Sequence, residues 1–331
     1  MHAAAINLRG GVSPRNTYLR GQSIIEYVLI IAVIGLVIVF AGPGVAGAIR
    51  NQFNLVGNTL NSGTNGGTEG GGASGGGSTG ADSATVQAAI AKDAKDWTLG
   101  EQKAVAEDIA AKGEASPAYA KAKAAMDAGT KFSMKLTDGQ TLKYHIIGIN
   151  HDDLADGSGK AGLTFLTTST TISSRMNATR TNVGGWEKSE LRAKMNSGEI
   201  WNLMPSDFQS KMKAVTKMTN NEGGFNGWHN EAVTATSDRL FLLSYSEIVP
   251  TSRWVSSVPW TSSEGTQYEA FKGKVTENNN SNSAIAVGGT WWERSVYPYD
   301  EECFLNAGIN GDPACSVNAT ASRCVCPAWC F

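Results

Sequence analysis

The side chains best suited to chemistry are the cysteines, since all five lie between residue 303 and Phe331. They are Cys303, Cys315, Cys324, Cys326 and Cys330. If Val325–Phe331 is a strand, the last three share one face, and Cys326 lies about 13 Å from Cys330, too far for a disulfide. Any disulfide would then use Cys303 or Cys315, and at least one thiol would stay unpaired. Buried free thiols that pack as small apolar groups are the alternative.

Metal-binding and catalytic patterns are weak in this sequence. Asn150–Gly159 holds three aspartates but lacks the residue order of an EF-hand, so a loop with Asx-turns is favoured over a calcium site. The cysteine segment has no histidine and no Cys-x-x-Cys pair, which argues against zinc and copper. His145, His151 and His229 belong to no metalloprotease motif. We therefore expect no metal, no cofactor and no enzyme activity, with a Ser/His/Asp site assembled in space left open.

The charge balance excludes one broad class of partner. The chain has 28 Lys and Arg residues against 30 Asp and Glu residues, and its formal net charge is −2. Proteins that bind nucleic acid through bulk charge are strongly basic, so we expect no nucleic-acid partner. With 331 residues, the chain is long enough for one large or two ordinary domains.

An acidic residue inside an apolar run marks the N-terminal segment. Ser23–Ala41 is apolar apart from Glu26, and as a helix it would span about 28 Å, roughly one bilayer core. Three arginines precede the run and only Arg50 soon follows it, which predicts a cytoplasmic N-terminus with the rest of the chain outside. A signal peptide cut near Ala46–Ala48 and a plain membrane anchor are the alternatives. A carboxylate within such a span is costly and usually marks function.

The residues around Glu26 resemble a known peptidase cleavage site. The stretch Arg20–Tyr27 resembles the prepilin-peptidase site of type IVb pilins of the Flp (Tad pilus) class. The resemblance implies cleavage after Gly21, so that the mature chain begins with Gln22 and has Glu26 and Tyr27 at its fifth and sixth positions. In that family the glutamate is thought to neutralise the N-terminal amine of a neighbouring subunit, which would give the buried charge a partner. Simple Flp pilins are very short, so this long chain suggests a minor, tip or decorated subunit.

Composition divides the rest of the chain. Residues 57–80 contain 11 glycines in 24 positions, which predicts a flexible linker. Residues 81–130 are rich in Ala, Lys, Asp and Glu and predict short helices, the strongest over Leu99–Lys112, as a lead-in to the next domain or as a stalk. The expected organisation is a leader over 1–21, a pilin-like transmembrane and assembly helix over 22–56, this linker, the helical spacer and a C-terminal domain over 131–331.

The C-terminal domain is predicted to be α+β, because short strand-like runs alternate with helical ones. All but one of the nine tryptophans lie here, which places the aromatic core in this region. Phe132–Leu136 and Thr141–Ile149 flank an Asp-Gly turn and predict a β-hairpin. Two helices are expected, one ending near Asn196 and one capped by Ser206 and reaching Met212. Further strand-like runs are Arg239–Ser244, Ala284–Ser295 and Val325–Phe331.

The sequence of this C-terminal region also resembles known protein domains. Several motifs agree in order with an uncharacterised domain of secreted and surface proteins of gut bacteria; they are Ile147–Asp153, Trp186–Arg192, Leu242–Glu247, Trp291–Ser295 and Val325–Ala328. The Trp-x-Arg-Ser motif and the terminal Val-x-Pro-Ala strand also look like the fold shared by C-type lectins and formylglycine-generating enzymes. Cys324 stands where the family pattern has glycine. The lectin-like resemblance implies a ligand surface near the chain end, which some members diversify by retroelements.

Loops near the chain end supply the predicted ligand contacts. Tyrosine, asparagine and acidic side chains on loops are adaptable contact residues, as in antibody paratopes. The predicted ligand-binding residues are Trp292, Tyr297, Tyr299, Asp300, Glu301, Glu302, Asn306, Asn310 and Asn318. An ordinary solvated loop whose tyrosines pack on the core is the alternative.

Together these patterns predict a surface adhesin with a pilin-like N-terminus. Its expected partners are prepilin peptidase, other pilin subunits, the membrane, and an extracellular protein or glycan ligand. It would lie in the bacterial cytoplasmic (inner) membrane before assembly and then at the cell surface or in a pilus, with the C-terminal domain outside. The alternatives are an extracytoplasmic enzyme of the formylglycine-generating type, dependent on Cys326 and Cys330, and a purely structural decorated pilin.

Overall fold

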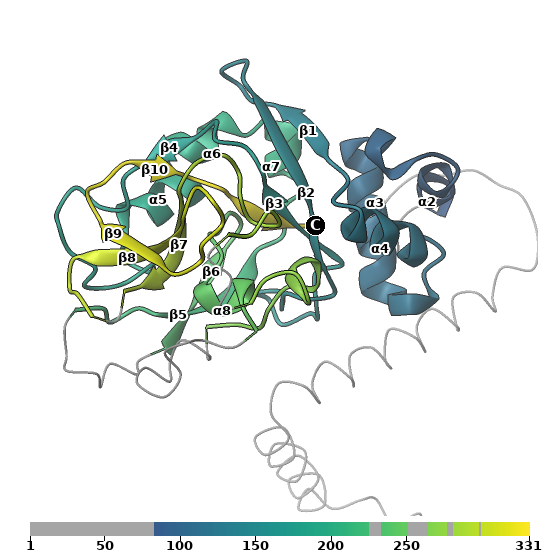
Figure 1. Ribbon diagram of the computed structural model, residues 1–331. Coiled ribbons are helices and arrows are strands. Elements are labelled where there is room, and N and C mark those ends of the chain that lie inside the picture. The colour runs from purple at the N-terminus through teal and green to yellow at the C-terminus, as the bar shows by residue number, and fades with distance from the viewer. Residues whose placement is uncertain (1–82, 225–232, 251–263, 277–280, 298) are drawn as a thin grey trace, which may run out of the picture. The chain divides into compact units, whose positions relative to one another are not determined.

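The structure, a computed structural model, describes residues 83–224, 233–250, 264–276, 281–297 and 299–331 (Figure 1). These residues belong to one compact unit, Thr68–Phe331. The predicted leader, the apolar segment and the glycine-rich linker lie outside the described residues. Among the residues that are described, no helix combines the length and the apolar character needed to cross a bilayer.

The alanine-rich segment forms three α-helices. They are α2 (Ser83–Ile90), α3 (Leu99–Lys112) and α4 (Tyr119–Asp127). Helix α3 has the predicted bounds, because Thr98 and Glu101 form a capping box at its start and Gly113, with φ 58°, ends it. Val105 and Ile109 on one face of α3 are fully buried, so this helix belongs to the core.

A four-stranded antiparallel sheet follows the helices. Its strands, in spatial order, are β1 (Phe132–Lys135), β2 (Thr141–Ile149), β3 (Leu163–Thr167) and β11 (Ala328–Cys330). The predicted β-hairpin is confirmed: β1 pairs with β2, and Gly139, at φ 88°, closes the turn between them. The last strand therefore pairs with one formed more than 150 residues earlier, a register that local sequence patterns do not specify.

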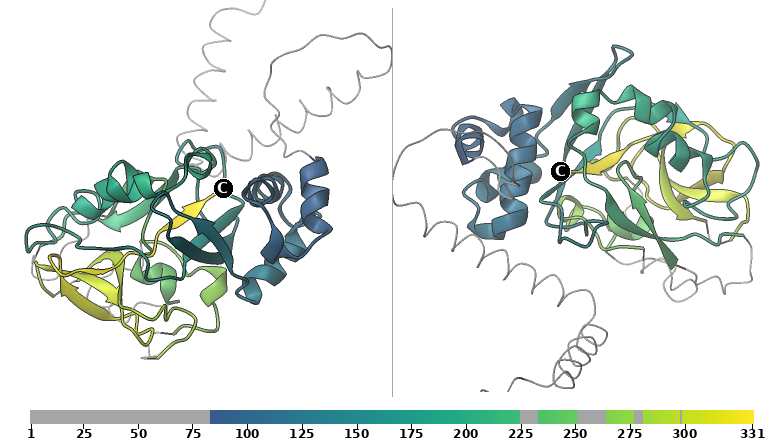
Figure 2. Two further views of the ribbon diagram at one scale, coloured as in Figure 1. Left: turned by 90° about the horizontal axis from the view of Figure 1, so that it is seen from above. Right: turned by 180° about the vertical axis from the view of Figure 1, so that it is seen from behind.

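The helices pack directly on this sheet (Figures 1 and 2). The Trp97 ring stacks on Phe132 at 6.3 Å, and the Tyr144 hydroxyl donates to Gln102 of α3 at 3.1 Å. Gly162 lies so close to α3 that a Cβ there would come within 1.8 Å of the Ala106 carbonyl oxygen. The segment predicted as a spacer is thus part of the same packing unit as the sheet, as a lead-in rather than a separate stalk.

A second sheet holds most of the chain end. Its five strands, in spatial order, are β4 (Ser173–Ser174), β10 (Arg323–Cys324), β7 (Trp291–Val296), β8 (Cys303–Ala307) and β9 (Cys315–Asn318). Strand β10 runs parallel to β7, and the other pairs are antiparallel. A separate two-stranded ribbon joins β5 (Val215–Asn220) to β6 (Val233–Asp238).

Short helices connect these strands. They are α5 (Glu190–Asn196), α6 (Glu199–Leu203), α7 (Ser206–Gln209), α8 (Tyr245–Ile248) and the 3-10 helix η3 (Glu269–Phe271). The described part of the C-terminal region is therefore mixed α+β, as predicted, but it holds four α-helices rather than two. The cap of α7 is Pro205 and not Ser206, which is the first helical residue, and this helix ends before Met212.

Two predicted strands take a different form. Within Arg239–Ser244, only Phe241 pairs, in an isolated bridge to Ala328, because the segment leads straight into the capping box of α8. Val325–Phe331 is not one strand, since Pro327 separates β10 from β11 and the two belong to different sheets. The prediction that Cys324 and Cys330 share one face of a single strand is therefore wrong.

Candidate functional site

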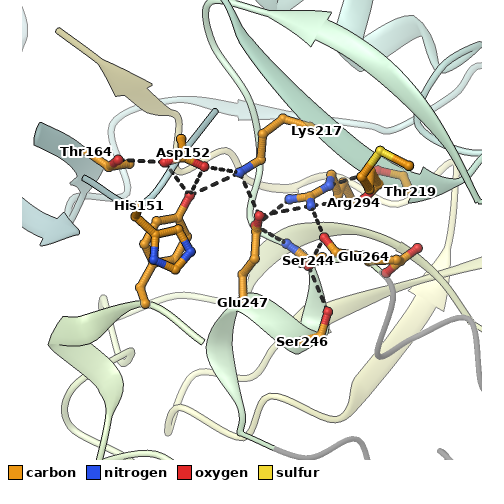
Figure 3. Close-up of polar contacts among 12 residues, drawn as sticks. His151, Asp152, Thr164, Lys217, Thr219, Ser244, Ser246, Glu247, Glu264 and Arg294 are labelled. Atoms are coloured by element: carbon orange, nitrogen blue, oxygen red, sulfur yellow. Dashed lines mark hydrogen bonds and ion pairs between the residues drawn. The ribbon is translucent and has the colours of Figure 1, made fainter. Parts of the chain in front are cut away.

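A buried chain of charges crosses the interior between the two sheets (Figure 3). Lys217 lies at its centre, with Nζ 2.6 Å from Oδ1 of Asp152 and 2.6 Å from Oε1 of Glu247. The Lys217 ammonium also donates to the Tyr268 hydroxyl at 3.1 Å. The three charged side chains are at most 3% exposed, so each charge depends on its neighbours for the solvation that water would otherwise give.

Arg294 continues the chain from Glu247. Its Nη1 lies 2.5 Å from Oε2 of Glu247 and its Nη2 3.0 Å from Oε1, a bidentate pair. Its other donors reach Thr219 Oγ1 at 2.8 Å and three carbonyl oxygens, those of Leu242 at 2.8 Å, Met218 at 3.2 Å and Glu264 at 2.6 Å. A fully buried guanidinium with every N–H direction engaged fixes the backbone of several loops at once.

Each member is positioned by a different element. Asp152 follows β2 through Asn150, whose φ of 50° turns the chain; Lys217 lies on β5; and Arg294 lies on β7. Glu247 belongs to the capping box of α8, where it accepts from the Ser244 amide at 3.0 Å. Three motifs quoted from the sequence resemblance therefore meet in this one network.

Mutual pairing keeps the network ionised. Burial alone would raise the pKa of Asp152, but the Lys217 ammonium outweighs it and holds the pKa well below its usual range. Burial likewise opposes ionisation of Glu247, and the charges of Arg294 and Lys217 lower its pKa. The two cations and two anions balance, and none reaches solvent, so this arrangement is suited to holding the fold and not to binding a ligand.

Two further carboxyls at the edge of the network lack a cation of their own. Glu264 accepts from the Asn220 amide at 2.8 Å and from the Ser295 hydroxyl, and burial raises its pKa to about 7. Neither carboxyl oxygen of Glu293 has a hydrogen-bond partner, and burial together with the nearby Glu264 carboxyl raises the pKa of Glu293 well above its usual range. Both acids are therefore stabilised in the protonated form within the folded protein.

Six of the nine predicted ligand-binding residues gather on one surface. Tyr297 and Tyr299–Glu302 lie on the turn from β7 to β8, and Asn318 ends β9 beside them, because Cys303 pairs with Asn318. We call these residues the β7–β8 loop surface. The two tyrosine rings lie 5.4 Å apart, and all six side chains are at least partly exposed.

The backbone of this turn is clamped by Asn182. Its side-chain amide donates to the carbonyls of Asp300 at 2.7 Å and Cys303 at 2.9 Å, and its own amide donates to the Glu301 carbonyl at 2.7 Å. Asn182 itself is fully buried. The turn thus presents outward side chains on a backbone that is fixed from below.

The other three predicted ligand-binding residues lie elsewhere. Trp292 and Asn306 face each other across β7 and β8 and are 0% and 2% exposed, so neither can contact a ligand at the surface. Trp292 instead donates to the Ser174 carbonyl at 2.9 Å, as part of the core. Asn310 is exposed but lies beyond the opposite end of β8, in the turn to β9. Burial of both faces explains the error, since all six residues of β7 and the last four of β8 are buried, which residue types alone did not reveal.

All five cysteines are free thiols in the structure. Cys326 and Cys330 are fully buried, and burial raises the pKa of both well above its usual range. Burial and the Asp300 carboxylate raise the pKa of the half-exposed Cys303 to about 11. Burial and the nearby Asp312 carboxylate raise the pKa of Cys315 as well. These four thiols are therefore held in the protonated, weakly nucleophilic form, and Cys303, Cys315 and Cys324 are the cysteines of intermediate burial.

The side chains of the aspartate-rich loop are engaged within the protein. Asp152 is buried in the network, Asp153 pairs with Lys160 at 3.0 Å, and Asp156 accepts from the Ser158 amide at 2.9 Å in an Asx-turn. Among the described residues, no cluster of three or more His, Cys, Asp or Glu side chains has the arrangement of a metal site.

Two histidines and the processing residues complete the predicted set. His151 stacks on Tyr268 at 4.0 Å and lies 3.1 Å from Glu269, whereas His145 is buried and its ring nitrogens have no partner. The site residues Gly21, Gln22, Glu26 and Tyr27 lie outside the described residues, as does His229.

Sequence reasoning missed the central residues of the network. Lys217 and Tyr268 stand in segments without a motif, and Glu264 is separated from Glu247 by 17 positions of unremarkable composition. Strand β5 gave no local signal either, since its apolar residues Val215 and Met218 fall on opposite faces and the pattern does not show which face is buried.

Comparison with known proteins identifies the family. Residues 161–331, just over half of the chain, match a domain of unknown function, DUF6273, and the chain belongs to this family. No curated protein and no solved structure matches it. The match contains Lys217, Glu247 and Arg294, but Asp152, the second counterion of Lys217, precedes it. The physical unit therefore extends further towards the N-terminus than the family match.

The raised pKa of Glu264 predicts a pH-dependent stability. Because the folded state keeps the Glu264 proton up to about pH 7 while the unfolded state releases it near 4.5, this group stabilises the fold fully below pH 4.5 and loses that contribution as pH rises through 7. The loss amounts to about 3 kcal/mol. Glu264→Gln mimics the protonated acid, so we expect the variant to match the wild type at pH 4.5 and to be more stable by up to that amount at pH 8.

The measurement is the free energy of unfolding in urea from pH 4 to 8. Glu187→Gln, at an exposed position, is the matched control and should follow the wild-type curve. Glu293 is present in all three proteins, and because the Glu264 carboxyl helps to raise its pKa, the difference between curves reports Glu264 together with its coupling to Glu293. Parallel curves for Glu264→Gln and the wild type would show that Glu264 is ionised in the folded protein.

Proposed function

We propose that this chain is a pilin-like cell-surface adhesin whose C-terminal domain binds an extracellular protein or glycan through the β7–β8 loop surface. The observation that carries the proposal is the combination of outward tyrosine, acidic and asparagine side chains with a clamped backbone. Binding sites commonly lie on loops held by a rigid scaffold, since the scaffold reduces the conformational entropy lost on binding. The loop surface has this construction.

The chemistry of the surface favours a polar partner with some apolar faces. Two neighbouring tyrosine rings offer flat, amphipathic contact area, and Asp300 and Glu301 offer acceptors. Glu302 pairs with Arg180 at 2.5 Å, so the rim carries both signs of charge. A lectin-like fold with a diversified binding surface at this end is part of the proposal and rests on sequence resemblance.

The N-terminal part of the proposal rests on the sequence alone. Cleavage after Gly21 would expose Gln22, and Glu26 within the apolar run would neutralise the amine of a neighbouring subunit in the membrane. Prepilin peptidase and other pilin subunits are then the partners, and the C-terminal domain lies outside the cytoplasmic membrane.

The burial of the thiols favours an adhesin over an enzyme of the formylglycine-generating type. Chemistry at Cys326 and Cys330 would need accessible thiolates, whereas both side chains are fully buried and their pKa values are raised. A decorated structural pilin would need no conserved surface chemistry and would bind no ligand, so it is tested by the same binding experiment.

The first test reads the N-terminus of the mature protein from a membrane or surface fraction by mass spectrometry. We expect a chain that begins at Gln22, because the residues around Gly21 resemble a prepilin-peptidase site. A chain that still begins at Met1, or one that begins after Ala48, would contradict pilin processing and leave an anchored or a secreted protein.

The second test screens the purified full-length chain against glycan and extracellular-protein arrays. For any hit, we expect Tyr297→Ser combined with Tyr299→Ser to weaken binding at least tenfold, because buried interface tyrosines commonly contribute more than about 1 kcal/mol. Tyr119→Ser, at the other partly exposed tyrosine of the described residues, should leave binding unchanged. Equal affinities of the double variant and the wild type would reject the loop surface, and no hit would favour the structural subunit.

A further inference from the structure

A second surface feature lies at the other end of β7. Ser173, Thr290, Ser322, Arg323 and Cys324 line an open pocket of about 240 Å³ where β4, β10 and β7 meet. Cys324 pairs with Ser173 on one side and with Trp291 on the other, and its amide donates to the Thr290 carbonyl at 2.9 Å. The walls of the pocket are therefore fixed by the backbone hydrogen bonds that join these strands of the five-stranded sheet.

Arg323 gives this pocket an unused charge. Its Nη1 donates to the Ser322 carbonyl at 2.8 Å, but its Nε is buried without a hydrogen-bond partner. Within the described part of the chain, Arg323 forms no ion pair. The outer nitrogens of the guanidinium are therefore the donors that a ligand in the pocket would meet, and their charge has no carboxylate counterion among the described residues.

The rest of the lining is made of hydroxyl groups. Ser173 and Ser322 are exposed, and Thr290 is partly exposed, so all three can donate to and accept from a ligand. Lys194 nearby donates to Ser174 Oγ at 3.2 Å, but it is already paired with Glu199 at 3.1 Å. The charge of the pocket lining is therefore that of Arg323, and no carboxylate is among the described lining residues.

We propose that this pocket binds the acidic terminal residue of a saccharide, one that carries a carboxylate or sulfate group among hydroxyl groups. The planar guanidinium of Arg323 presents paired donors that match a carboxylate or sulfate, and the serine and threonine hydroxyls match the sugar hydroxyls. The pocket is smaller than the roughly 300–1,000 Å³ of sites for drug-sized ligands, which suits a single sugar ring.

This site is separate from the β7–β8 loop surface. Thr290 precedes β7 and Tyr297 follows it, so the strand holds the two places on the order of 20 Å apart. The inference therefore goes beyond the proposed function, and it stands or fails independently of ligand binding at the loop surface.

The binding test uses the full-length chain with three probes: 3′-sialyllactose, N-acetylglucosamine 6-sulfate and neutral lactose. By ligand-observed NMR titration, we expect at least one acidic probe to bind at least tenfold more tightly than lactose. Arg323→Met should abolish that preference, whereas Lys213→Met, which removes an exposed charge elsewhere, should preserve it. Equal binding of acidic and neutral probes, no binding of any probe at 10 mM, or an unchanged preference in Arg323→Met would overturn the proposal.

Cys324 supplies a readout that locates the ligand. Its thiol lines the pocket and is partly exposed, so a bound saccharide should slow its alkylation by iodoacetamide severalfold, as followed by peptide mass spectrometry. Neutral lactose at the same concentration is the control and should leave the alkylation rate of Cys324 unchanged. An unchanged rate with a saturating acidic saccharide as well would refute binding in the pocket.

Discussion

The rest of the structure depends on the burial of the Lys217 ammonium group. An isolated ammonium in a protein interior costs several kcal/mol, so this residue can stay charged only if two carboxylates reach it. Asp152 arrives from the end of β2 and Glu247 from the first turn of α8, each 2.6 Å away. Meeting that requirement ties the four-stranded sheet, the β5–β6 ribbon and, through Arg294, the five-stranded sheet into one unit.

The β7–β8 loop surface is held by backbone contacts of its own. Asn182 binds the carbonyls of Asp300, Glu301 and Cys303, so the turn does not depend on its outward side chains. The loop surface can therefore differ in sequence without loss of the scaffold. The burial of Lys217 also explains why a family match that starts at residue 161 does not mark a complete folding unit, since the match omits Asp152.

Local patterns predicted the parts of the fold that local chemistry determines. Helix α3 and strand β2 have the expected bounds and β1 ends one residue earlier than expected, because a capping box and an Asp-Gly turn specify these elements within a few residues. The pairing of β11 with β3 and the separation of Cys324 from Cys330 depend on contacts distant in sequence, and were not foreseen. Six residues predicted to bind a ligand are at least partly exposed on the loop surface, and their role in binding stays a prediction. Trp292 and Asn306 are buried because both faces of β7 and β8 are covered, which depends on contacts distant in sequence.

The most direct test of this account compares two lysines that each pair with an aspartate. Lys217→Met leaves Asp152 and Glu247 buried beside a missing cation, so the free energy of unfolding should fall by about 3–5 kcal/mol. Lys160→Met breaks the exposed pair with Asp153 and should cost less than about 1 kcal/mol. Both values come from urea denaturation of the full-length chain at pH 7. Equal, small losses in the two variants would contradict the claim that the buried ammonium organises the fold.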